Sequence, residues 1–516
     1  MSTKILWADD EIDLLKPHVL FLENKGYKVI PVVSGNDALD ILKKEPIDII
    51  FLDEQMPGLS GIETMKRIKA HYRHIPVVMI TKSEEEHIME DAIGTNIADY
   101  LIKPVNPKQI LLCLKKNIEN KKIISEKSTI AYQSAFREIA MKISDRLSVK
   151  EWEDLYKELI YWELELDKIE DSGVSEILAN QKEEANTQFA KYIMKNYVDW
   201  INGRGNDKPL FSHTILKEKL FPYLSENSSV FLMVIDNLRF DQWKTIQPVI
   251  NDYFRVEQEE MTYSILPTAT HYARNALFSG LMPSEIEKKY PKLWLNENDE
   301  GGKNQYEHEL LTEYLKRYGK NVKHSFHKIL NVDFGRKVFE NIHQLLSNNL
   351  NVIIFNFVDM LSHARTDIDI IRELAEDEKS YRSVTASWFE NSVMLDMLKF
   401  LAEKKVPVFL TTDHGAIKIS KSIKVIGDKN TNSNLRYKVG RNMDYNPKEV
   451  FEVKNPAEFY LPQEGISHRF IFAMREDFFV YPNNYNHYAN YYKNTFQHGG
   501  ISMEEMMIPF VKLTPK

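Results

Sequence analysis

The sequence has only one cysteine, Cys113, among its 516 residues. A single cysteine excludes any disulfide bond within the chain and is typical of proteins in a reducing compartment. No apolar run is long enough to span a bilayer, and the first residues do not resemble a signal peptide, because an apparent core strand starts at Lys4. We therefore expect a cytoplasmic protein without a membrane span.

The chain also lacks an excess of positive charge, with 67 lysines and arginines against 75 aspartates and glutamates. The formal net charge of −8 argues against general binding to polyanions, although it leaves room for a local basic patch. No internal repeat is visible, and no helix-turn-helix pattern follows the first domain, which counts against direct DNA binding. With 43% hydrophobic and 28% charged residues, the composition supports sizeable cores, and the length suggests three or four folded units.

Four short apolar runs near the N-terminus are each followed by polar residues. They cover residues 4–8, 47–52, 76–80 and 98–102, and helical stretches separate them. This alternation predicts a doubly wound parallel sheet with its polar residues at the strand carboxyl ends. The carboxylates of Asp9, Asp10 and Asp53 would repel one another unless a cation lay among them, and oxygen ligands suit Mg²⁺. Lys103 could pair with whatever Asp53 carries.

Residues 3 to about 122 closely resemble the receiver domain of bacterial response regulators. The resemblance implies that Asp53 accepts a phosphoryl group from a histidine kinase, and that Asp10, Asp53 and the backbone carbonyl of Gln55 bind magnesium. It also implies switch roles for four residues: Asp9, Thr81, Tyr100 and Lys103. In the alternative interpretation, each aspartate only caps a helix after a strand. The combined spacing of the whole set makes that interpretation remote.

The middle of the chain, residues 123–205, changes character. Strand patterns disappear, and apolar residues recur at helical spacing from Trp152 to Leu166. Ser148 and Glu151 form a capping box in front of this stripe, and a second helix is predicted over residues 174–200. We expect a helical bundle of three or four helices that links two α/β domains, with the aromatic stripe as its core.

Five short segments in residues 206–516 carry metal-binding side chains. These segments contain Asp236 in SSVFLMVID, Thr270 in PTATHYAR, Asp359 and His363 in FNFVDMLSH, Asp413 and His414 in FLTTDHG, and His498 in FQHGG. Three of them follow or end apolar runs, at residues 230–235, 352–358 and 406–410, that are typical of buried parallel strands. The ligands should therefore meet where the strand carboxyl ends lie, at one edge of the sheet.

The residue types indicate a site for two metal ions. Three aspartates and three histidines supply six ligands, enough for two zinc-like ions with positions left open for substrate. Two divalent cations against three carboxylates leave about one positive charge, which attracts an anion such as phosphate. Any one segment alone would more plausibly hold a helix cap or a satisfied polar histidine. All five in this order make that interpretation improbable.

The order of these segments resembles the alkaline phosphatase superfamily, and most of all its PglZ-type domains. The resemblance implies that Asp236, Asp413 and His414 bind one zinc ion and that a second set binds the other, with Thr270 as the nucleophile between them. That second set is Asp359, His363 and His498. Thr268 lies two residues away, and spacing alone does not decide between the two threonines.

Three further features of residues 206–516 are open at this point. Arg274, one helical turn after Thr270, could clamp phosphate oxygens, but an ordinary exposed helix arginine is equally plausible. Residues 284–350 read as a polar helical insertion. Residues 420–490 interleave tyrosines with cations, a pattern that can bind nucleotides or simply form a solvated surface. These cations are Lys421, Lys424, Lys429, Arg436, Lys438 and Arg441.

As a whole, the chain resembles the PorX-type family of response regulators. The resemblance implies a phosphorylation-dependent homodimer, regulatory or secretion-machinery protein partners linked to type IX secretion, and hydrolysis of phosphodiesters such as cyclic or linear oligonucleotides. Two alternatives remain: a regulatory adaptor whose metal domain is only a scaffold, and a zinc phosphomonoesterase. The predicted fold is α/β, with a receiver domain (1–122), a helical bundle (123–205) and an alkaline-phosphatase-like domain (206–516).

Overall fold

The structure is a computed structural model that describes residues 3–72, 75–82, 97–168, 172–205, 207–225, 228–367, 369–428, 431–463, 465 and 467–516. Within these ranges, the structure describes only the backbone of residues 118–130, 172 and 365–371. The chain divides into two compact units, Met1–Gln133 and Ser134–Lys516. We describe each unit by itself.

The first unit contains a five-stranded parallel sheet in the order β2-β1-β3-β4-β5; the sequence analysis predicted a parallel sheet and four of these strands, but not β2. Its strands are β1 (Lys4–Ala8), β2 (Lys28–Val32), β3 (Ile49–Asp53), β4 (Val77–Thr81) and β5 (Asp99–Ile102). Strands β3 and β4 begin and end slightly later than predicted, so Asp53 and Thr81 are themselves the last strand residues. Both therefore lie at the carboxyl edge of the sheet.

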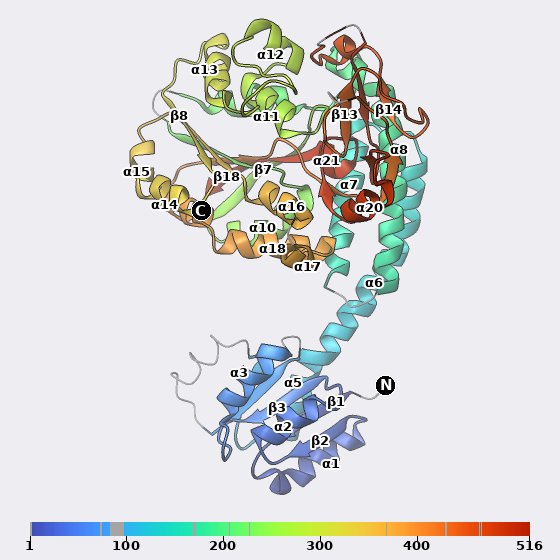
Figure 1. Ribbon diagram of the computed structural model, residues 1–516. Helices are drawn as coiled ribbons and strands as arrows, with labels where there is room; N and C mark the ends of the chain where they lie inside the picture. The colour runs from blue at the N-terminus through green and yellow to red at the C-terminus, as the bar shows by residue number, and fades with distance from the viewer. Residues whose placement is uncertain are drawn as a thin grey trace. The chain divides into compact units, whose positions relative to one another are not determined.

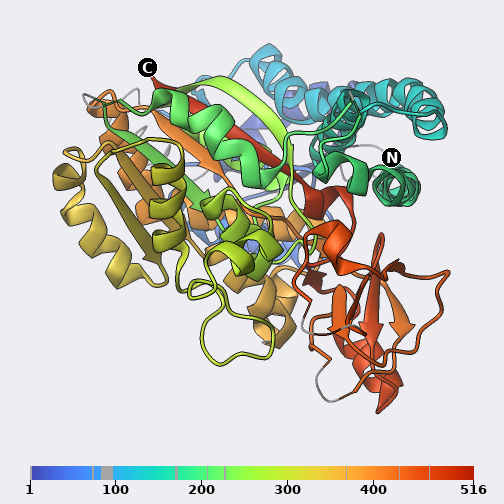
Figure 2. The ribbon, with the colours of Figure 1, turned by 90° about the horizontal axis from the view of Figure 1, so that it is seen from above.

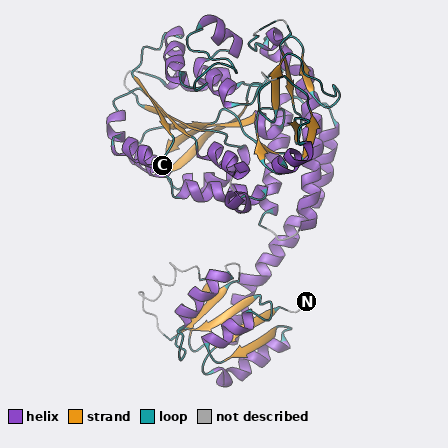
Figure 3. Cartoon of the chain, viewed as in Figure 1, coloured by secondary structure: helices purple, strands orange, loops and turns teal. Residues whose placement is uncertain are grey.

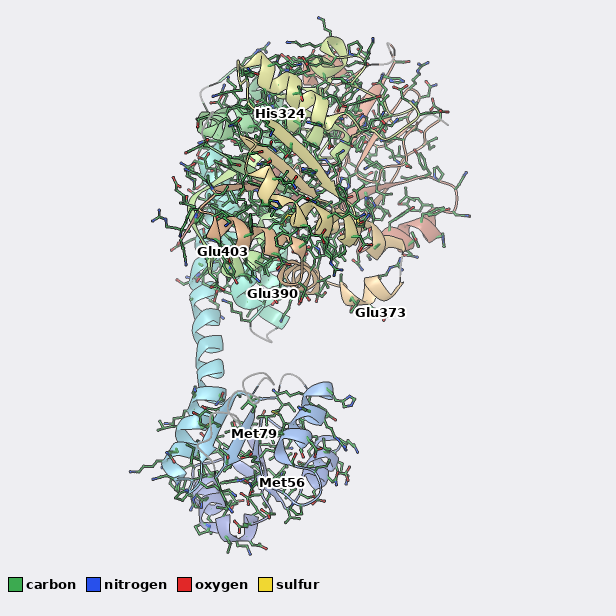
Figure 4. All side chains as sticks on the ribbon, turned by 90° about the vertical axis from the view of Figure 1, so that its left-hand side faces the viewer. Met56, Met79, His324, Glu373, Glu390 and Glu403 are labelled. Atoms are coloured by element: carbon green, nitrogen blue, oxygen red, sulfur yellow. The ribbon has the colours of Figure 1, made fainter. Side chains whose placement is uncertain are left out.

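Helices α1 (Lys16–Asn24), α2 (Gly35–Leu42), α3 (Gly61–His71) and α5 (Pro107–Leu114) accompany this sheet (Figure 3). Successive residues of a strand point to opposite faces, and the apolar strand residues accordingly divide into two buried clusters. Met56 and Met79, both labelled in Figure 4, belong to the same cluster. Apolar side chains on both faces explain why the central strands are continuously hydrophobic.

Three long helices, α6 (Asn120–Ser144), α7 (Val149–Leu166) and α8 (Ser172–Ile201), follow the receiver sheet. The boundary between the two units falls within α6, and α7 and α8 belong to the second unit. Helix α7 starts with the predicted capping box of Ser148 and Glu151 and buries its apolar stripe, including Trp152 and Tyr156. The predicted bundle therefore packs as part of the same unit as the C-terminal domain.

The second unit is built around a six-stranded sheet in the order β7-β18-β10-β6-β9-β8. The strands are β6 (Val230–Ile235), β7 (Phe254–Tyr263), β8 (His324–Ile329), β9 (Leu350–Phe355), β10 (Val408–Thr411) and β18 (Met507–Pro515). Strands β10, β6, β9 and β8 are mutually parallel, and β18 runs antiparallel to β10 and β7. All residues of the three predicted central strands are buried.

Strand β8 was not predicted, because residues 284–350 were interpreted as a polar helical insertion. Its sequence, HSFHKI, is mostly half-exposed and lacks an apolar run, as suits a strand at the edge of the sheet. Figure 4 labels His324 at the start of this strand. The predicted strand over residues 352–358 also ends earlier, because Phe357 and Val358 already belong to a helix.

Helices cover both faces of this sheet (Figure 1). They are α9 (Ser212–Ile215), α10 (Phe240–Ile250), α11 (Thr270–Ser279), α12 (Pro283–Lys289), α13 (Glu307–Arg317), α14 (Val332–Glu340), α15 (Ile342–Leu345), α16 (Phe357–Asp367), α17 (Asp369–Leu374), α18 (Glu378–Glu390) and α19 (Val393–Glu403). None of the helices in the described ranges is long and apolar enough to cross a bilayer.

Residues 417–497 form small sheets that lie together beside the main sheet (Figure 2, orange to red). These sheets pair β11 (Ile417–Lys418) with β17 (Phe496–Gln497), β12 (Lys421–Lys424) with β16 (Asp477–Val480), and β15 (Arg469–Phe472) with β13 (Tyr437–Gly440) and β14 (Phe451–Val453). Helix α20 (Tyr485–Tyr492) follows, and α21 (Met503–Met506) leads into β18.

Candidate active site

The predicted ligands gather at the carboxyl ends of three adjacent strands, β10, β6 and β9. Asp236 comes directly after β6, and Asp413 and His414 follow β10 within three residues. Asp359 lies in the first turn of α16, four residues after β9, and His363 is one turn further on the same helix. The sheet topology therefore brings together segments that are up to about 180 residues apart in the sequence.

Asp236, Asp413 and His414 form one buried cluster in which the potential ligand atoms lie within 4.8 Å of one another. The Nδ1 atom of His414 lies 3.2 Å from the carbonyl of Gly415, which leaves Nε2 pointing toward Oδ2 of Asp413 at 3.6 Å. That Oδ2 is buried and has no hydrogen-bond partner. Burial, followed by repulsion from Asp236, raises the pKa of Asp413 well above its usual value.

Asp359, His363 and His498 form the second cluster, again within 4.8 Å. His363 and His498 direct Nε2 toward Oδ1 of Asp359, at 3.6 Å and 3.7 Å. Burial and the nearby Asp236 raise the pKa of Asp359 to about 6, whereas burial lowers the pKa of His498 well below its usual value. The two clusters touch, because the rings of His414 and His498 stack with centroids 4.3 Å apart.

These donor sets fit two zinc ions. Each cluster offers three oxygen or nitrogen donors, which leaves a tetrahedral position for a substrate oxygen. Neutral imidazole is the ligand form of histidine, and burial lowers the pKa of both His414 and His498, which favours it. Burial, and then repulsion among the crowded carboxylates, raises the pKa values of Asp359 and Asp413, and bound cations would relieve that repulsion.

Thr270 points into the space between these groups. It is the first residue of α11, and its Oγ1 lies 3.0 Å from Nε2 of His414 and 3.5 Å from Oδ1 of Asp236. Ala269 occupies the capping position, so the Thr270 hydroxyl is not used to cap the helix. Asn304 donates to the Thr270 carbonyl at 2.8 Å and so fixes its backbone.

Thr268 is fully buried and has a different environment. Its Oγ1 donates to the carbonyl of Gly500 at 2.9 Å and accepts a hydrogen bond from the amide of Gly499 at 3.1 Å. Its carbonyl lies 3.2 Å from Nδ1 of His498, so Thr268 orients that histidine. The geometry therefore favours Thr270 as the nucleophile and gives Thr268 a structural role.

The environment of Arg274 differs from both expectations stated for it. The side chain is neither exposed nor available as a phosphate clamp, because it is 3% exposed and its guanidinium pairs with two carboxylates. One is Oδ2 of Asp236, and the other is Oε1 of Glu307 at 2.7 Å. Lys328 pairs with the second oxygen of Glu307 at 2.6 Å. Arg274 thus orients Asp236, whose Oδ1 remains directed at the site.

Asn237 is a site residue that the sequence reasoning missed. Its Nδ2 donates to Oδ1 of Asp359 at 3.4 Å, and its backbone amide donates to Oδ1 of Asp413 at 3.4 Å. The residue adopts a left-handed conformation with φ 65°, which asparagine tolerates better than most residues. An asparagine directly after a strand-end aspartate is the only signal that could have indicated it.

Two glycines allow close backbone contacts at the turns that carry His414 and His498. A Cβ atom on Gly415 would lie 2.2 Å from the carbonyl oxygen of Glu504, and one on Gly500 would lie 2.4 Å from that of Ala473. Both positions therefore require glycine, because a side chain would collide with rigid backbone. The approach at Gly415 places the His414 turn against α21, and the approach at Gly500 places the His498 turn against the end of β15.

The first unit holds its own acidic site at the carboxyl edge of its sheet. Asp9, Asp10 and Asp53 have carboxylate oxygens within 4.8 Å of one another, beside a depression of about 590 Å³ that Gln55 also lines. Burial raises the pKa of Asp53. Lys103 pairs with Asp9 at 3.0 Å and with Asp53 at 3.1 Å. An all-oxygen set of this kind fits magnesium.

The other predicted switch residues of this unit, Thr81 and Tyr100, lie on the two strands that follow β3 in the sheet. Thr81, at the end of the next strand, donates its hydroxyl to Glu54, and Tyr100 on β5 is 45% exposed. Residues 83–96 lie outside the described part of the chain. The described part of the face near Tyr100 therefore consists of β5 and α5.

Comparison with known proteins matches three family models along the chain. A response regulator receiver domain matches residues 5–115, a PorX response regulator linker domain matches residues 122–201, and a BREX system PglZ alkaline phosphatase-like domain matches residues 215–513. The chain belongs to the PglZ alkaline phosphatase-like family. It combines that domain with a receiver and a PorX-type linker, as the sequence resemblance implies, and none of the three models is a DNA-binding domain.

Curated relatives that match about a quarter of the chain include two bacterial regulatory proteins. Response regulator GtcR of Aneurinibacillus migulanus is 30% identical over 25% of this chain and 56% of its own length. Regulatory protein VanRc of Enterococcus gallinarum is 32% identical over 23% of this chain and 51% of its own length. The chain thus spans about half the length of the curated relatives it matches.

Solved structures similar to part of the chain include two response regulator proteins. Chemotaxis response regulator CheY4 of Vibrio cholerae is 27% identical, with a TM-score of 0.22, and covers 23% of this chain and 100% of its own. A receiver domain from Clostridium thermocellum is 29% identical, with a TM-score of 0.22, over 23% of this chain and 98% of its own. A receiver domain takes its phosphoryl group from a phosphodonor such as a histidine kinase.

Proposed function

We propose that this chain is a response regulator whose PglZ-type domain is a two-zinc phosphodiesterase acting on nucleotide-type phosphodiesters. The observation that carries the proposal is the position of Thr270, whose hydroxyl lies 3.0 Å from Nε2 of His414 and 3.5 Å from Oδ1 of Asp236, in the first of two adjoining ligand clusters. A domain that served only as a scaffold would have no use for a hydroxyl held there.

The proposed roles follow from the contacts around Thr270. Asp236, Asp413 and His414 would hold one zinc ion, and Asp359, His363 and His498 the other. When bound, the ions would supply Lewis acidity that favours ionisation of a hydroxyl and neutralises charge on phosphate oxygens. Arg274 holds Asp236 in place, and Thr268 holds the ring of His498.

In the proposed reaction the Thr270 oxygen loses its proton and attacks phosphorus. A bond forms between Oγ1 and phosphorus, and the bond from phosphorus to the leaving alcohol breaks, which leaves a phosphothreonine ester. The leaving alkoxide takes up a proton and departs as an alcohol. Water then attacks phosphorus, the bond to Oγ1 breaks, and the hydroxyl of Thr270 is restored.

The charge distribution supports a diester over a monoester. Two arginines influence the ligands electrostatically, Arg274 and Arg436, and both are already paired with carboxylates. Among the described residues, neither of them offers an uncompensated charge for the second negative charge of a monoester. A diester carries a single negative charge, which matches the surplus of about one positive charge expected from two zinc ions and three aspartates.

The receiver would control this activity. Phosphorylation of Asp53 by a histidine kinase, with Mg²⁺ at Asp10, Asp53 and the Gln55 carbonyl, would change the surface near Thr81 and Tyr100 and favour a homodimer. The match to the PorX linker supports contacts with secretion-machinery or regulatory partners and a link to type IX secretion. The absence of a predicted membrane span supports a cytoplasmic site of action.

A metal-replete assay tests the proposal. Zinc-loaded protein should hydrolyse bis(p-nitrophenyl) phosphate and short oligonucleotides faster than p-nitrophenyl phosphate. Faster release from the monoester would make the protein a phosphomonoesterase instead. Full zinc occupancy without hydrolysis of any of these compounds, with and without a phosphorylation mimic on the receiver, would identify the domain as a regulatory scaffold.

A further inference from the structure

A cavity of about 190 Å³ lies beside the metal ligands, at the carboxyl ends of β8 and β9. The loop after β8, the first turn of α16 and the turn between α18 and α19 line it. Its largest flat surface is aromatic, because the rings of Phe357 and Trp388 stack with centroids 4.6 Å apart and an interplanar angle of 2°. Ligands of open α/β sheets bind at this edge of the sheet.

The mouth of the cavity exposes large apolar side chains to water. Leu330, Val332 and Met360 line the cavity and are 56%, 63% and 53% exposed. Single exposed apolar residues are ordinary, but a group of them around one cavity marks a binding surface. A flat apolar ring lying between these side chains and Trp388 would remove them from water.

The cavity also contains a polar atom that lacks a partner. Oδ1 of Asn356 is buried and accepts no hydrogen bond from the described residues, although the backbone carbonyl of the same residue is used by α16. A buried acceptor without a donor is unfavourable, so a ligand that brings an N–H group would be bound more tightly. The occupant should therefore be both flat and apolar, with N–H donors at its edge.

The cavity is next to the catalytic centre. Met360 follows the metal ligand Asp359 on α16, so their side chains point about 100° apart around the helix axis. A ligand that spans this step on α16 would place its phosphate at the metal ligands and another group in the cavity. An aromatic ring is the right size, since a cavity of about 150 Å³ can hold benzene. A whole nucleotide would not fit in 190 Å³.

We propose that this cavity binds one nucleobase of the phosphodiester substrate, an inference that rests on the proposed function. The base stacks against the aromatic pair of Phe357 and Trp388 and donates an N–H group to Asn356, while Met360 covers its outer face. Bases that have left a stack are commonly held in this way, by an aromatic face and by hydrogen bonds to the base edge.

Binding to zinc-loaded Thr270→Ala protein tests the inference without any need for turnover. The ligands are the dinucleotide ApA and the same sugar-phosphate backbone with both bases removed, measured by titration calorimetry. We expect ApA to bind at least about fivefold more tightly, as is typical of one base stacked on an aromatic side chain. Met360→Gln and Asn356→Ala, each added to the Thr270→Ala protein, should reduce that ratio to below about twofold.

Met194→Gln is the matched control, because Met194 is a 41% exposed methionine on α8 that does not line the cavity. It should keep the full ratio. Equal binding of the two ligands, or no binding of either, would overturn the inference. One further result would overturn the inference: Met360→Gln leaves the affinity ratio unchanged but changes the mass of the protein in sedimentation. The cavity would then contact a second copy of the chain.

The proposed function is judged separately, by wild-type hydrolysis of bis(p-nitrophenyl) phosphate and of the backbone without bases. Hydrolysis of both, together with equal binding of ApA and the abasic compound, would retain the phosphodiesterase and remove the base site. Tight and base-dependent binding without any hydrolysis would do the opposite.

Discussion

Asn186 on the linker helix α8 donates its side-chain amide to Glu504 at 3.0 Å and accepts the backbone amide of Met503 at 2.8 Å. The next residue, Glu505, accepts the amide of Gly500 on its side chain and the amide of Gly415 on its backbone carbonyl. Those two glycines adjoin the turns of His498 and His414. The linker is therefore connected to the metal ligands by a short series of buried hydrogen bonds.

The first prediction tests this connection at Lys182, which pairs with Glu163 at 2.7 Å and with Glu504 at 3.5 Å. Among the described residues, Lys182→Met leaves the buried Glu504 without its cation and leaves Glu163 paired with Arg382 alone, and it should lower the stability of the second unit by about 3 kcal/mol or more. Thermal unfolding measures the change. Lys191→Met, at an exposed position on the same helix, is the control and should have little effect. Equal stability of the two variants would show that Lys182 is not structurally important.

A second prediction concerns metal content. Purified protein should contain about two zinc ions per chain, because each cluster supplies three donors. Asp236→Ala or His414→Ala should remove one ion, and Asp359→Ala or His498→Ala the other. Elemental analysis measures the stoichiometry. Two full equivalents in all four variants would refute the ligand assignment.

The third prediction distinguishes the two threonines. Thr270→Ala should lower turnover by at least about a thousandfold while both metals stay bound, because the nucleophile is lost and the ligands are not. Thr268→Val removes only hydrogen bonds to Gly499 and Gly500, so we expect a milder loss that includes weaker zinc binding at His498. A dead Thr268→Val protein combined with an active Thr270→Ala protein would reverse the assignment.

The fourth prediction concerns Lys438, which looked in the sequence like part of a basic surface. The side chain is 1% exposed, and burial lowers its pKa to about 7. Between that pH and 10.5 the unfolded chain binds a proton that the folded chain lacks, so stability should rise with pH by up to about 1.4 kcal/mol per pH unit. Lys438→Met should flatten this rise and raise stability at pH 7.

Denaturant unfolding of both proteins at pH 7.5 and 9 measures the difference. The wild type should gain more stability than the variant over this interval, because other titrating groups are common to the two proteins. The same dependence in both proteins would mean that Lys438 is charged in the folded state.

The sequence predicted the three central strands of the second sheet and the clustering of the side chains that follow them for one reason: buried parallel strands and the polar residues that end them are visible locally. Asp236, Asp359 and Asp413 each needed only a preceding apolar run to be placed at one edge. Ion pairing could not be predicted in this way, because it depends on contacts between distant segments. The sequence suggested that Arg274 could bind phosphate. In the structure, Asp236 and Glu307, which belongs to another helix, neutralise its charge.

Two other differences have the same origin. In the sequence, Arg436 and Lys438 look like part of a basic surface, but the structure buries both of them. Arg436 also pairs with Glu505, which lies 69 residues later in the chain. Lys429 lies outside the described residues. Strand β8 was missed because an edge strand needs no apolar run, and only its pairing with β9 identifies it.

The last prediction concerns the link between the receiver and the metal site. The two sites lie in separate units, and screening at physiological salt limits direct electrostatic effects to roughly 8–10 Å, so control must act through a change of assembly or conformation. Beryllofluoride with Mg²⁺ should mimic phosphate at Asp53, where Lys103 is already poised at 3.1 Å to bind it. Sedimentation should then show a shift from monomer toward dimer, through the face near the exposed Tyr100.

Asp53→Ala should abolish the shift and keep both zinc ions. An unchanged mass with and without beryllofluoride would refute dimerisation as the switch, and would leave the zinc chemistry untouched.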